Sequence, residues 1–248
     1  MTESSVIIPD WPAPASVRAV ITTRSMPGNS QPPYDAFNLG LRSGEDENIV
    51  QANRVSLKRA LQLPSPPRWL SQVHGDRSLR VTEEIFDGEQ QADAVFTTQP
   101  NIVLAILTAD CLPILLCADD GSEIAAIHAG WRGLSAGIVE STVARLRTPR
   151  ANLLAWLGPA IGRASYEVGE EVRTAFVSKS ANAASAFVAT RPGHWLCDLY
   201  SLVRQKLHVV GVEKIFGGNF DTFTDARFYS YRRDGALSGR FASLIWLT

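Results

Sequence analysis

The sequence contains three apolar, strand-like runs, and each one holds a side chain that can bind a soft metal ion shortly before a Gly or Pro. The side chains and their runs are His74 in 69–76, Cys111 in 108–113 and His128 in 125–133. Gly and Pro at these positions indicate loops that begin where strands end. A rigid sheet can aim side chains from such loops at one point, and α/β proteins place their chemistry there. These runs therefore favour a fold in which three strand ends meet.

Two imidazoles and one thiolate are suitable ligands for zinc, with a fourth position left for water or substrate. That open position distinguishes a catalytic site from a closed structural one. The sequence contains no zinc-finger pattern, no Cys-x-x-Cys and no His-Glu-x-x-His, so spacing alone does not identify a metal site. Taken singly, Cys111 fits an ordinary buried thiol, and a His beside Gly fits a solvated turn. The metal site is a hypothesis that depends on the fold.

The composition excludes several classes of protein. With 248 residues, of which 45% are hydrophobic, the chain can bury a large core, and we expect one domain over residues 1–248. A formal net charge of −1 gives no basic field for nucleic acid or an anionic membrane. No run approaches the ~20 apolar residues of a membrane span, and the first five residues do not resemble a secretory signal. Three cysteines, an odd number, fit a reducing compartment. We expect a cytoplasmic monomer without nucleic-acid or membrane partners.

Apolar periodicity predicts strands and helices that are mixed along the chain. The predicted strands are 17–23, 93–97, 102–108, 112–118, 123–128, 152–157, 214–216 and 241–246, and the predicted helices are 45–61, 130–147, 170–177 and 199–210. Asp198 is suited to cap the last of these helices, and the Ser/Ala-rich segment 178–189 is expected to be mobile. Because strands and helices do not alternate regularly, the pattern favours an α/β fold of the α+β kind with a mixed sheet.

Further polar residues lie close to the three candidate ligands. Asp110 precedes Cys111 and could accept a hydrogen bond near the site, carry a proton, or cap a turn. Arg132 follows His128 by four residues at a predicted helix start, where a guanidinium could bind phosphate or carboxylate in a bidentate manner. Arg54 is a second candidate, although its place in a predicted helix is more typical of a solvated arginine. The segment 228–235, rich in Tyr and Arg, fits either a pocket wall or an exposed turn.

Two other chemistries use the same residues. Cys111 could be a nucleophile with His128 or His74 as its base. A His2Cys set also binds copper in electron-transfer sites, usually with a weak axial methionine. The sequence has only Met1 and Met26, and neither lies in an apolar strand-like run. Four histidines are too few for a multicopper centre, so that class is excluded by counting.

Taken together, a series of short stretches resembles the YfiH-type family. Its members are also described as polyphenol oxidoreductases, laccase-like proteins, peptidoglycan editing factors and purine nucleoside phosphorylases. The resemblance extends from about residue 17 to 246, and its ordered combination is specific. The matching stretches are 38–40, 51–54, 72–75, 108–113, 128–133, 158–162, 166–169 and 230–235.

The resemblance implies one zinc ion held by His74, Cys111 and His128, in a cleft at the strand ends of a mixed-sheet sandwich with its helices outside. It also implies phosphorolysis of adenosine, inosine, guanosine and methylthioadenosine, and deamination of adenosine. The candidate substrate-binding residues within the matching stretches are Asn38, Arg54, Gln72 and Arg232. The sequence departs from its relatives at Asp221, where similar sequences usually carry Cys. That position is not a metal ligand, so the departure leaves the zinc hypothesis intact.

The leading hypothesis is a zinc-dependent purine nucleoside phosphorylase with adenosine deaminase activity, whose small-molecule partners are nucleoside and phosphate. Asp110 and Arg132 are its candidate catalytic residues, and copper is the alternative metal. The competing enzyme hypotheses are a hydrolase that edits a peptidoglycan precursor, a copper-dependent polyphenol oxidoreductase and a hydrolase based on Cys111. A zinc-stabilised binding protein without turnover is the hypothesis outside enzymes.

Overall fold

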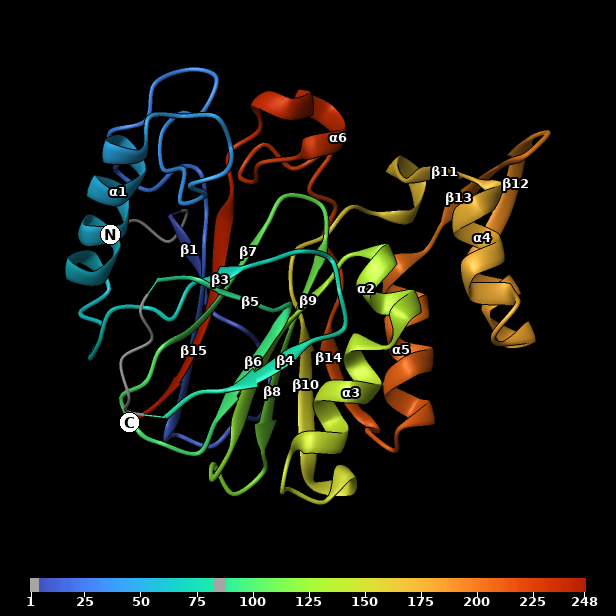
Figure 1. Cartoon of the computed structure of the whole chain (residues 1–248), viewed down its shortest axis with the longest axis horizontal. Helices are drawn as coiled ribbons and strands as arrows, with labels where there is room; N and C mark the ends of the chain where they lie inside the picture. Colours follow the sequence, from blue (N-terminus) through green and yellow to red (C-terminus); the bar gives the residue numbers. More distant parts are fainter. Residues whose placement is uncertain (1–4, 83–87) are drawn as a thin grey trace.

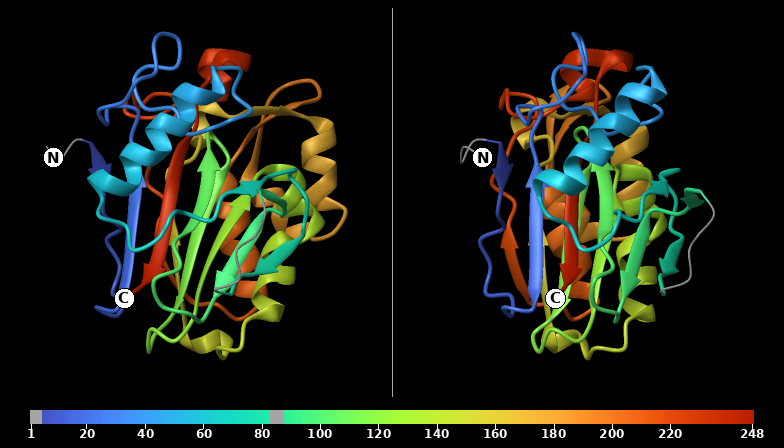
Figure 2. Two further views of the ribbon diagram at one scale, coloured as in Figure 1. Left: turned by 60° about the vertical axis from the view of Figure 1, so that its left-hand side comes forward. Right: turned by 90° about the vertical axis from the view of Figure 1, so that its left-hand side faces the viewer.

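The computed structural model describes residues 5–82 and 88–248. Residues 1–4, part of the stretch used above to argue against a secretory signal, lie outside the described residues. Two β-sheets pack face to face, and helices cover the outer face of each sheet (Figure 1, Figure 2). The structure therefore confirms the predicted mixed-sheet sandwich with helices outside.

The first sheet has four strands in the order β1-β2-β15-β7, and all of its neighbouring pairs are antiparallel. Its strands are β1 (Val6–Ile7), β2 (Val17–Thr22), β15 (Phe241–Leu247) and β7 (Leu104–Thr108). The last strand of the chain thus lies in the interior of this sheet, between β2 near the N-terminus and β7 in the middle. Pairing across such a sequence separation joins the two ends of the chain into one core.

The second sheet has six strands in the order β14-β10-β8-β9-β6-β4. The pairs β10–β14 and β4–β6 are parallel, and the other pairs are antiparallel, so the sheet is mixed. Its strands are β14 (Lys214–Gly217), β10 (Leu153–Leu157), β8 (Leu112–Ala118), β9 (Ile124–Ala129), β6 (Ala94–Thr97) and β4 (Ser78–Arg80). The predicted strand 112–118 is confirmed with the same bounds. The predicted strands 214–216 and 241–246 belong to different sheets.

Because side chains alternate along a strand, each sheet contributes to a hydrophobic core on both of its faces. On β15, Phe241 and Ile245 contact the core between the sheets, while Leu244 and Trp246 contact the core under the first helix. This follows from the two-residue period of a strand, which sends neighbouring side chains to opposite faces. Because both faces of the strand are covered, all seven of its residues are buried. Such a strand appears in the sequence as a continuous apolar run.

The helices divide between the two outer faces. Helix α1 (Glu47–Ala60) covers the four-stranded sheet and contributes Leu57 to the core between them. The helices on the six-stranded sheet are α2 (Trp131–Ala136), α3 (Ile138–Arg145) and α5 (Leu199–Val209). No helix among the described residues has the length and apolar character that crossing a membrane requires.

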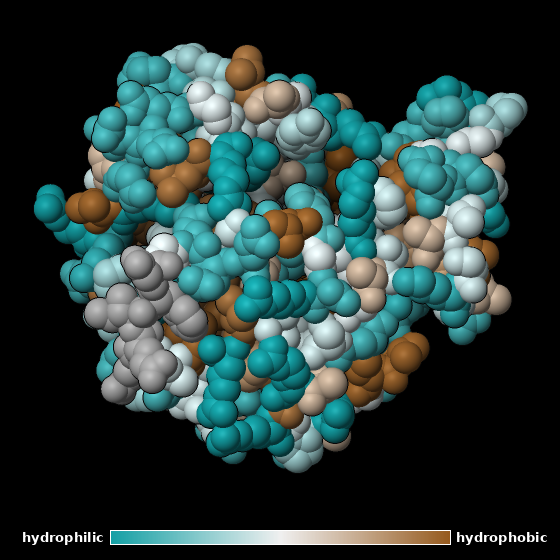
Figure 3. Space-filling view, in the orientation of Figure 1, coloured by the Kyte–Doolittle hydropathy of each residue, from teal (hydrophilic) through white to brown (hydrophobic). Residues whose placement is uncertain are grey.

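A smaller unit projects from this body beside α5 (Figure 3). It consists of α4 (Glu170–Val177) and a three-stranded antiparallel sheet of β11 (Glu167–Gly169), β13 (His194–Cys197) and β12 (Phe187–Arg191). The remaining elements of the described residues are α6 (Tyr231–Asp234), the parallel pair β3 (Leu70–Ser71) and β5 (Gln90–Gln91), and four short 3-10 helices, Arg150–Asn152, Arg163–Ser165, Ala181–Ala186 and Gly235–Leu237.

Two predicted segments differ from the structure. The helix expected over 130–147 is two helices, because the chain turns at Gly137, whose φ of 113° is open to glycine and strained for other residues. The segment 178–189, expected to be mobile, forms the 3-10 helix Ala181–Ala186 and the start of β12. Ala183 and Ala186 are buried against α4 and α5, so tertiary packing orders a sequence that carries few local signals.

Asp198→Ala should lower the free energy of unfolding by about 0.5–2 kcal/mol, because the Asp198 carboxylate accepts a hydrogen bond from Ser201 N at 2.9 Å and caps α5. Asp198→Asn keeps an acceptor oxygen and should retain most of this stability. Urea unfolding of the wild type and both variants measures the difference. Equal losses in the two variants would contradict the capping role.

Candidate metal centre

The fold brings together the three side chains that end the strand-like runs. His74 lies in the turn after β3, Cys111 lies directly before β8, and His128 lies at the end of β9. Their ligand atoms all lie within 4.8 Å of one another, and Cys111 Sγ is 3.7 Å from His74 Nε2. The two imidazole rings meet edge to face, with centroids 4.7 Å apart. His128 is buried, Cys111 is half-buried and His74 is exposed, so one side of the group is open.

The geometry of this group fits one metal ion. With metal–ligand lengths of about 2.0–2.1 Å for nitrogen and about 2.3 Å for sulfur, tetrahedral zinc separates a nitrogen and a sulfur ligand by roughly 3.6 Å. The distance of 3.7 Å between Cys111 Sγ and His74 Nε2 is close to this value, and all three ligand atoms lie within 4.8 Å of one another. Three donors with one open side are the arrangement of a catalytic zinc site. Among residues 5–82 and 88–248 this is the only group of three or more His, Cys, Asp or Glu side chains that could hold a metal ion.

Asp93 is a buried carboxylate beside these ligands, and sequence reasoning missed it. It lies directly before β6 and has no exposed surface. Its Oδ1 accepts hydrogen bonds from His128 Nδ1 at 2.8 Å and from His74 N at 2.9 Å. Its Oδ2 accepts from Gly75 N at 2.7 Å and Val73 N at 3.2 Å. The sequence does contain a signal, because Asp93 is a charged residue within the otherwise apolar run 92–96. That run predicted only the start of a strand.

Two glycines allow the chain to approach the centre closely. A Cβ atom at Gly130 would lie 2.7 Å from His74 Cδ2 and 3.1 Å from Cys111 Sγ. A Cβ atom at Gly133 would lie 2.6 Å from the carbonyl oxygen of Gly75. The turn from β9 into α2 therefore packs directly against the loop that carries His74, and a larger residue at either position would displace that loop.

Electrostatic coupling charges the centre when no metal is bound. Burial opposes the thiolate of Cys111, but the charge and hydrogen bond of His128, aided by His74, lower the pKa of Cys111 to about 6. Burial likewise opposes the imidazolium of His128, yet Cys111 and Asp93 raise its pKa to about 9. The two shifts together favour the thiolate–imidazolium pair in the metal-free centre. A thiolate is the form of cysteine that binds metals and attacks electrophiles.

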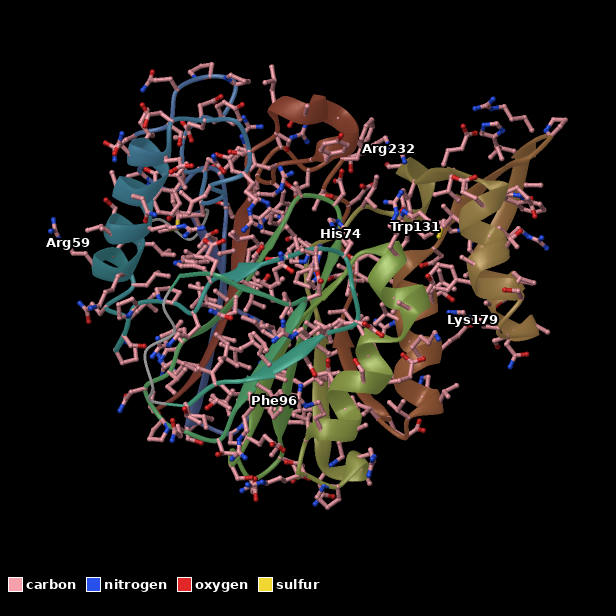
Figure 4. The ribbon with its side chains drawn as sticks, in the orientation of Figure 1. Arg59, His74, Phe96, Trp131, Lys179 and Arg232 are labelled. Carbon is pink, nitrogen blue, oxygen red and sulfur yellow. The ribbon has the colours of Figure 1, made fainter. Side chains whose placement is uncertain are left out.

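The centre opens on a cleft with a volume of about 550 Å³, the size of a small-molecule site. Trp131 of α2 and Arg232 of α6 border it beside His74 (Figure 4). Among residues 5–82 and 88–248, five arginines line this cleft, against two carboxylates, Glu89 and Asp110, so this part of its wall carries a positive charge that suits an anionic ligand. The arginines are Arg42, Arg54, Arg132, Arg232 and Arg240.

Asp110 lies in the cleft wall next to Cys111, with a φ of 84°. Its Oδ1 accepts a hydrogen bond from Thr222 Oγ1, and its Oδ2 accepts from Arg232 N, both at 2.6 Å. The Arg232 guanidinium donates to the carbonyl oxygen of Glu167 at 2.8 Å. Asp110 thus ties the loop between β7 and β8 to the start of α6, and it still faces the cleft.

The two predicted anion-binding arginines lie in different environments. Arg132 is exposed, its guanidinium lies 4.5 Å from the ring centre of Trp131, and it forms no ion pair with a carboxylate among the described residues. Arg54 is only 7% exposed, so a solvated arginine was the wrong expectation there. It donates to Leu39 O at 2.9 Å and to Glu89 Oε1 at 2.8 Å. Its Nη2 has no partner among the described residues.

Two other candidate residues use their side-chain polar atoms in hydrogen bonds within the protein. Gln72 lines the cleft, but its amide donates to Leu107 O at 2.7 Å and accepts from Leu107 N at 2.8 Å. Asn38 is fully buried and is absent from the cleft lining; its Oδ1 accepts from the backbone N–H of Gly40 and Arg240. Both side chains hold segments that form the cleft.

Asp221, the position at which the sequence departs from its relatives, does not line the cleft. Its Oδ1 accepts a hydrogen bond from Gly162 N at 2.9 Å, and its Oδ2 accepts from Ser165 Oγ at 2.6 Å. The carboxylate therefore organises a turn behind the wall that carries Ile161 and Tyr166. Its effect on the cleft is indirect.

The sandwich carries one His–Cys–His group at its strand ends, with an arginine-lined cleft beside it. These features define an α/β protein with a single candidate metal centre among its described residues. The family model described as multi-copper polyphenol oxidoreductase laccase matches residues 18–248, and the chain belongs to this family.

Named relatives support the same family. The Escherichia coli (strain K12) protein called purine nucleoside phosphorylase YfiH is 49% identical, covering 98% of this chain and 99% of its own length. The Pseudomonas aeruginosa purine nucleoside phosphorylase PA4543 is 50% identical, with 97% and 98% covered. The crystal structure of Neisseria meningitidis protein NMB0706 matches with a TM-score of 0.93 and 41% identity, over 98% of this chain and 99% of that one. The YfiH-type resemblance is thereby confirmed.

Iodoacetamide should alkylate Cys111 in the metal-free protein at a rate that rises with pH around a midpoint of about 6, because the thiolate is the nucleophile and its pKa is lowered to about 6. Below that pH the thiol is protonated and the rate should fall. Burial raises the pKa of Cys117 and of Cys197 to about 12, so both should stay unmodified. Peptide mass spectrometry over pH 4–9 measures the profile, with Cys111→Ser as the control. A midpoint near the ordinary value of about 8.5 would contradict the coupling.

Proposed function

We propose that this protein is a zinc-dependent purine nucleoside phosphorylase that also deaminates adenosine. The observation that carries the proposal is the position of the His2Cys group at one side of a cleft to which the described residues contribute five arginines and two carboxylates. A metal-binding group beside a positive wall suits a reaction between a neutral nucleoside and an anionic co-substrate. The names of the relatives, at 49% and 50% identity, support the same activity.

In this proposal, His74, Cys111 and His128 hold zinc, whose role when bound is to polarise a substrate oxygen and lower the pKa of water. Two imidazoles and one thiolate with one side open form a ligand set that suits zinc. A blue-copper site usually adds a weak methionine ligand, and Met26 is packed in the core under α1.

The arginines would bind phosphate. Arg132 is the best placed of them for this role, because it is exposed at the cleft and has no carboxylate partner among the described residues. Arg54 Nη2, which has no hydrogen-bond partner in the described part of the chain, and the guanidinium of Arg232 add donors on other parts of the lining. A guanidinium can hold two phosphate oxygens at once, which would orient the third for attack at C1′ of the sugar.

Asp110 is proposed to carry a proton. As the bond between C1′ and the purine breaks, the leaving base must gain a proton, and Asp110 is the carboxylate in the cleft nearest in sequence to Cys111. Each of its oxygens accepts one hydrogen bond in the protein, which leaves one lone pair on each free. Adenosine, inosine, guanosine and methylthioadenosine share the purine and the C1′ bond, so one cleft would serve all four.

A hydrolase that uses Cys111 is the second candidate, and the lowered pKa of Cys111 favours it. In that case His128 would be the base and no metal would be required. Copper-dependent polyphenol oxidation, which the family description names, would need a mononuclear site here, because the described residues offer only one group of three ligands.

Product analysis of the purified protein with adenosine, with and without phosphate, tests the proposal. We expect ribose 1-phosphate and adenine only when phosphate is present, and inosine in both cases. A strong chelator should abolish both activities, and zinc should restore them. Full activity in the metal-free protein, lost on alkylation of Cys111, would assign the reaction to the cysteine. Oxidation of phenols by copper-loaded protein, without turnover of nucleosides, would assign it to copper.

Arg132→Lys keeps the charge but loses the planar fork, so kcat/KM for phosphate should fall roughly ten- to hundredfold, the effect of losing a charge-assisted contact. Deamination needs no phosphate and should fall less. Arg59→Lys is the matched control, because Arg59 is exposed on α1 and points away from the cleft (Figure 4). Kinetics of both reactions and the Tm of each variant decide. Equal loss of both activities with a lower Tm would place Arg132 among the residues that only support the loop.

A further inference from the structure

Asp93 contacts both histidines of the candidate metal centre, in two different ways. It is bound to His128 twice: its carbonyl oxygen accepts from His128 N at 2.7 Å, and its Oδ1 accepts from His128 Nδ1 at 2.8 Å. These two bonds hold His128 both at its backbone and at its imidazole ring. Because Nδ1 is occupied, Nε2 is the ring nitrogen left to face Cys111 and His74.

The other contact of Asp93 is with the backbone that carries His74. Three successive N–H groups, those of Val73, His74 and Gly75, point at the carboxylate at distances of 3.2, 2.9 and 2.7 Å. His74 adopts a φ of 60°, in the left-handed region that a non-glycine residue rarely occupies. Successive N–H groups in such a turn form a concave anion site, which the buried carboxylate fills. The carboxylate thus holds the turn that aims the His74 ring at Cys111.

We propose that Asp93 is the positioning residue that sets both histidines of the metal centre. The inference rests on the proposed function, because it assumes that His74, Cys111 and His128 bind a metal. A carboxylate on Nδ1–H fixes the tautomer of a ligating histidine, orients its ring and increases the basicity of Nε2. Here the same carboxylate also orients the second histidine through its backbone. One buried charge therefore determines the directions of two of the three ligands.

A general structural role of a buried carboxylate must be separated from this specific one. Glu123, which directly precedes β9 as Asp93 directly precedes β6, provides a matched control. It is 2% exposed, and its Oε2 accepts from Arg147 N at 2.8 Å, from Thr148 N at 3.0 Å and from Thr148 Oγ1 at 2.8 Å. It lies outside the cleft lining. Glu123→Gln and Asp93→Asn both replace a buried, hydrogen-bonded carboxylate by its amide, and only the second touches the centre.

The experiment compares the wild type, Asp93→Asn and Glu123→Gln, each stripped of metal. Competition with a chromogenic chelator gives the zinc affinity, and the visible spectrum of the cobalt(II)-loaded protein gives the ligand geometry. For Asp93→Asn we expect zinc binding to be weakened roughly 10–100-fold, the usual effect of removing such a partner, and the cobalt bands to shift. For Glu123→Gln we expect a lower Tm of the metal-free protein, with affinity and spectrum equal to those of the wild type.

Each outcome decides between the two proposals. If Asp93→Asn binds zinc as tightly as the wild type and gives the same cobalt spectrum, the positioning role is wrong and the metal centre stands. If the wild type takes up neither zinc nor cobalt, the metal centre itself is wrong, and the inference falls with it. Should Asp93→Asn fail to fold, nitrogen-15 spectra of the zinc-loaded wild type give the answer. A proton on His128 Nδ1 with metal on Nε2 is required, and metal on Nδ1 overturns the inference.

Discussion

The register of strand β9 is the constraint on which the candidate metal centre depends. On one side β9 pairs with β8, with Leu112 opposite Ala129, so Cys111 lies across from the end of β9. On the other side it pairs with β6, with Ala94 opposite Ile127, so Asp93 lies across from His128. A slip of one residue would turn His128 to the opposite face of the sheet, among the helix-facing side chains. Three of the four residues that build the centre are thus placed by one strand and its two neighbours.

His74 reaches the centre by a different route. Its turn follows the two-residue strand β3, which belongs to a separate pair of strands and gives little rigidity. The turn is held instead by the carboxylate of Asp93 and by the close packing of Gly133 against Gly75 O. On this side of the centre, the hydrogen bonds to Asp93 therefore hold the ligand in position, as the sheet does for His128 and Cys111. The glycines of the 130–133 turn allow the necessary approach.

Local patterns in the sequence predicted those parts of the structure that local interactions determine. Continuous apolar runs gave the central strands, the cap at Asp198 gave the start of α5, and Gly or Pro after an apolar run identified the three residues of the candidate centre. Long-range contacts determine the rest. The roles of Asp93 and Arg54 depend on partners 35 residues away in each case, His128 and Glu89, and no local pattern contains such pairs. The short strands of the projecting unit are likewise fixed by pairing with one another.

Metal binding and cysteine catalysis would use the same electrostatic device in this cleft. Asp93 and the Cys111 thiolate both favour positive charge between them, and in the metal-free protein a proton on His128 supplies it. A divalent cation bound to neutral His128 would supply two positive charges in place of one, while also drawing in His74, which a Cys–His pair does not need. The ring centroid of His74 lies 4.7 Å from that of His128, and the turn that carries His74 is held by the same carboxylate. A third metal ligand needs such a fixed position, whereas a Cys–His pair does not. The left-handed conformation of His74 is therefore a further observation in support of the proposed metal site.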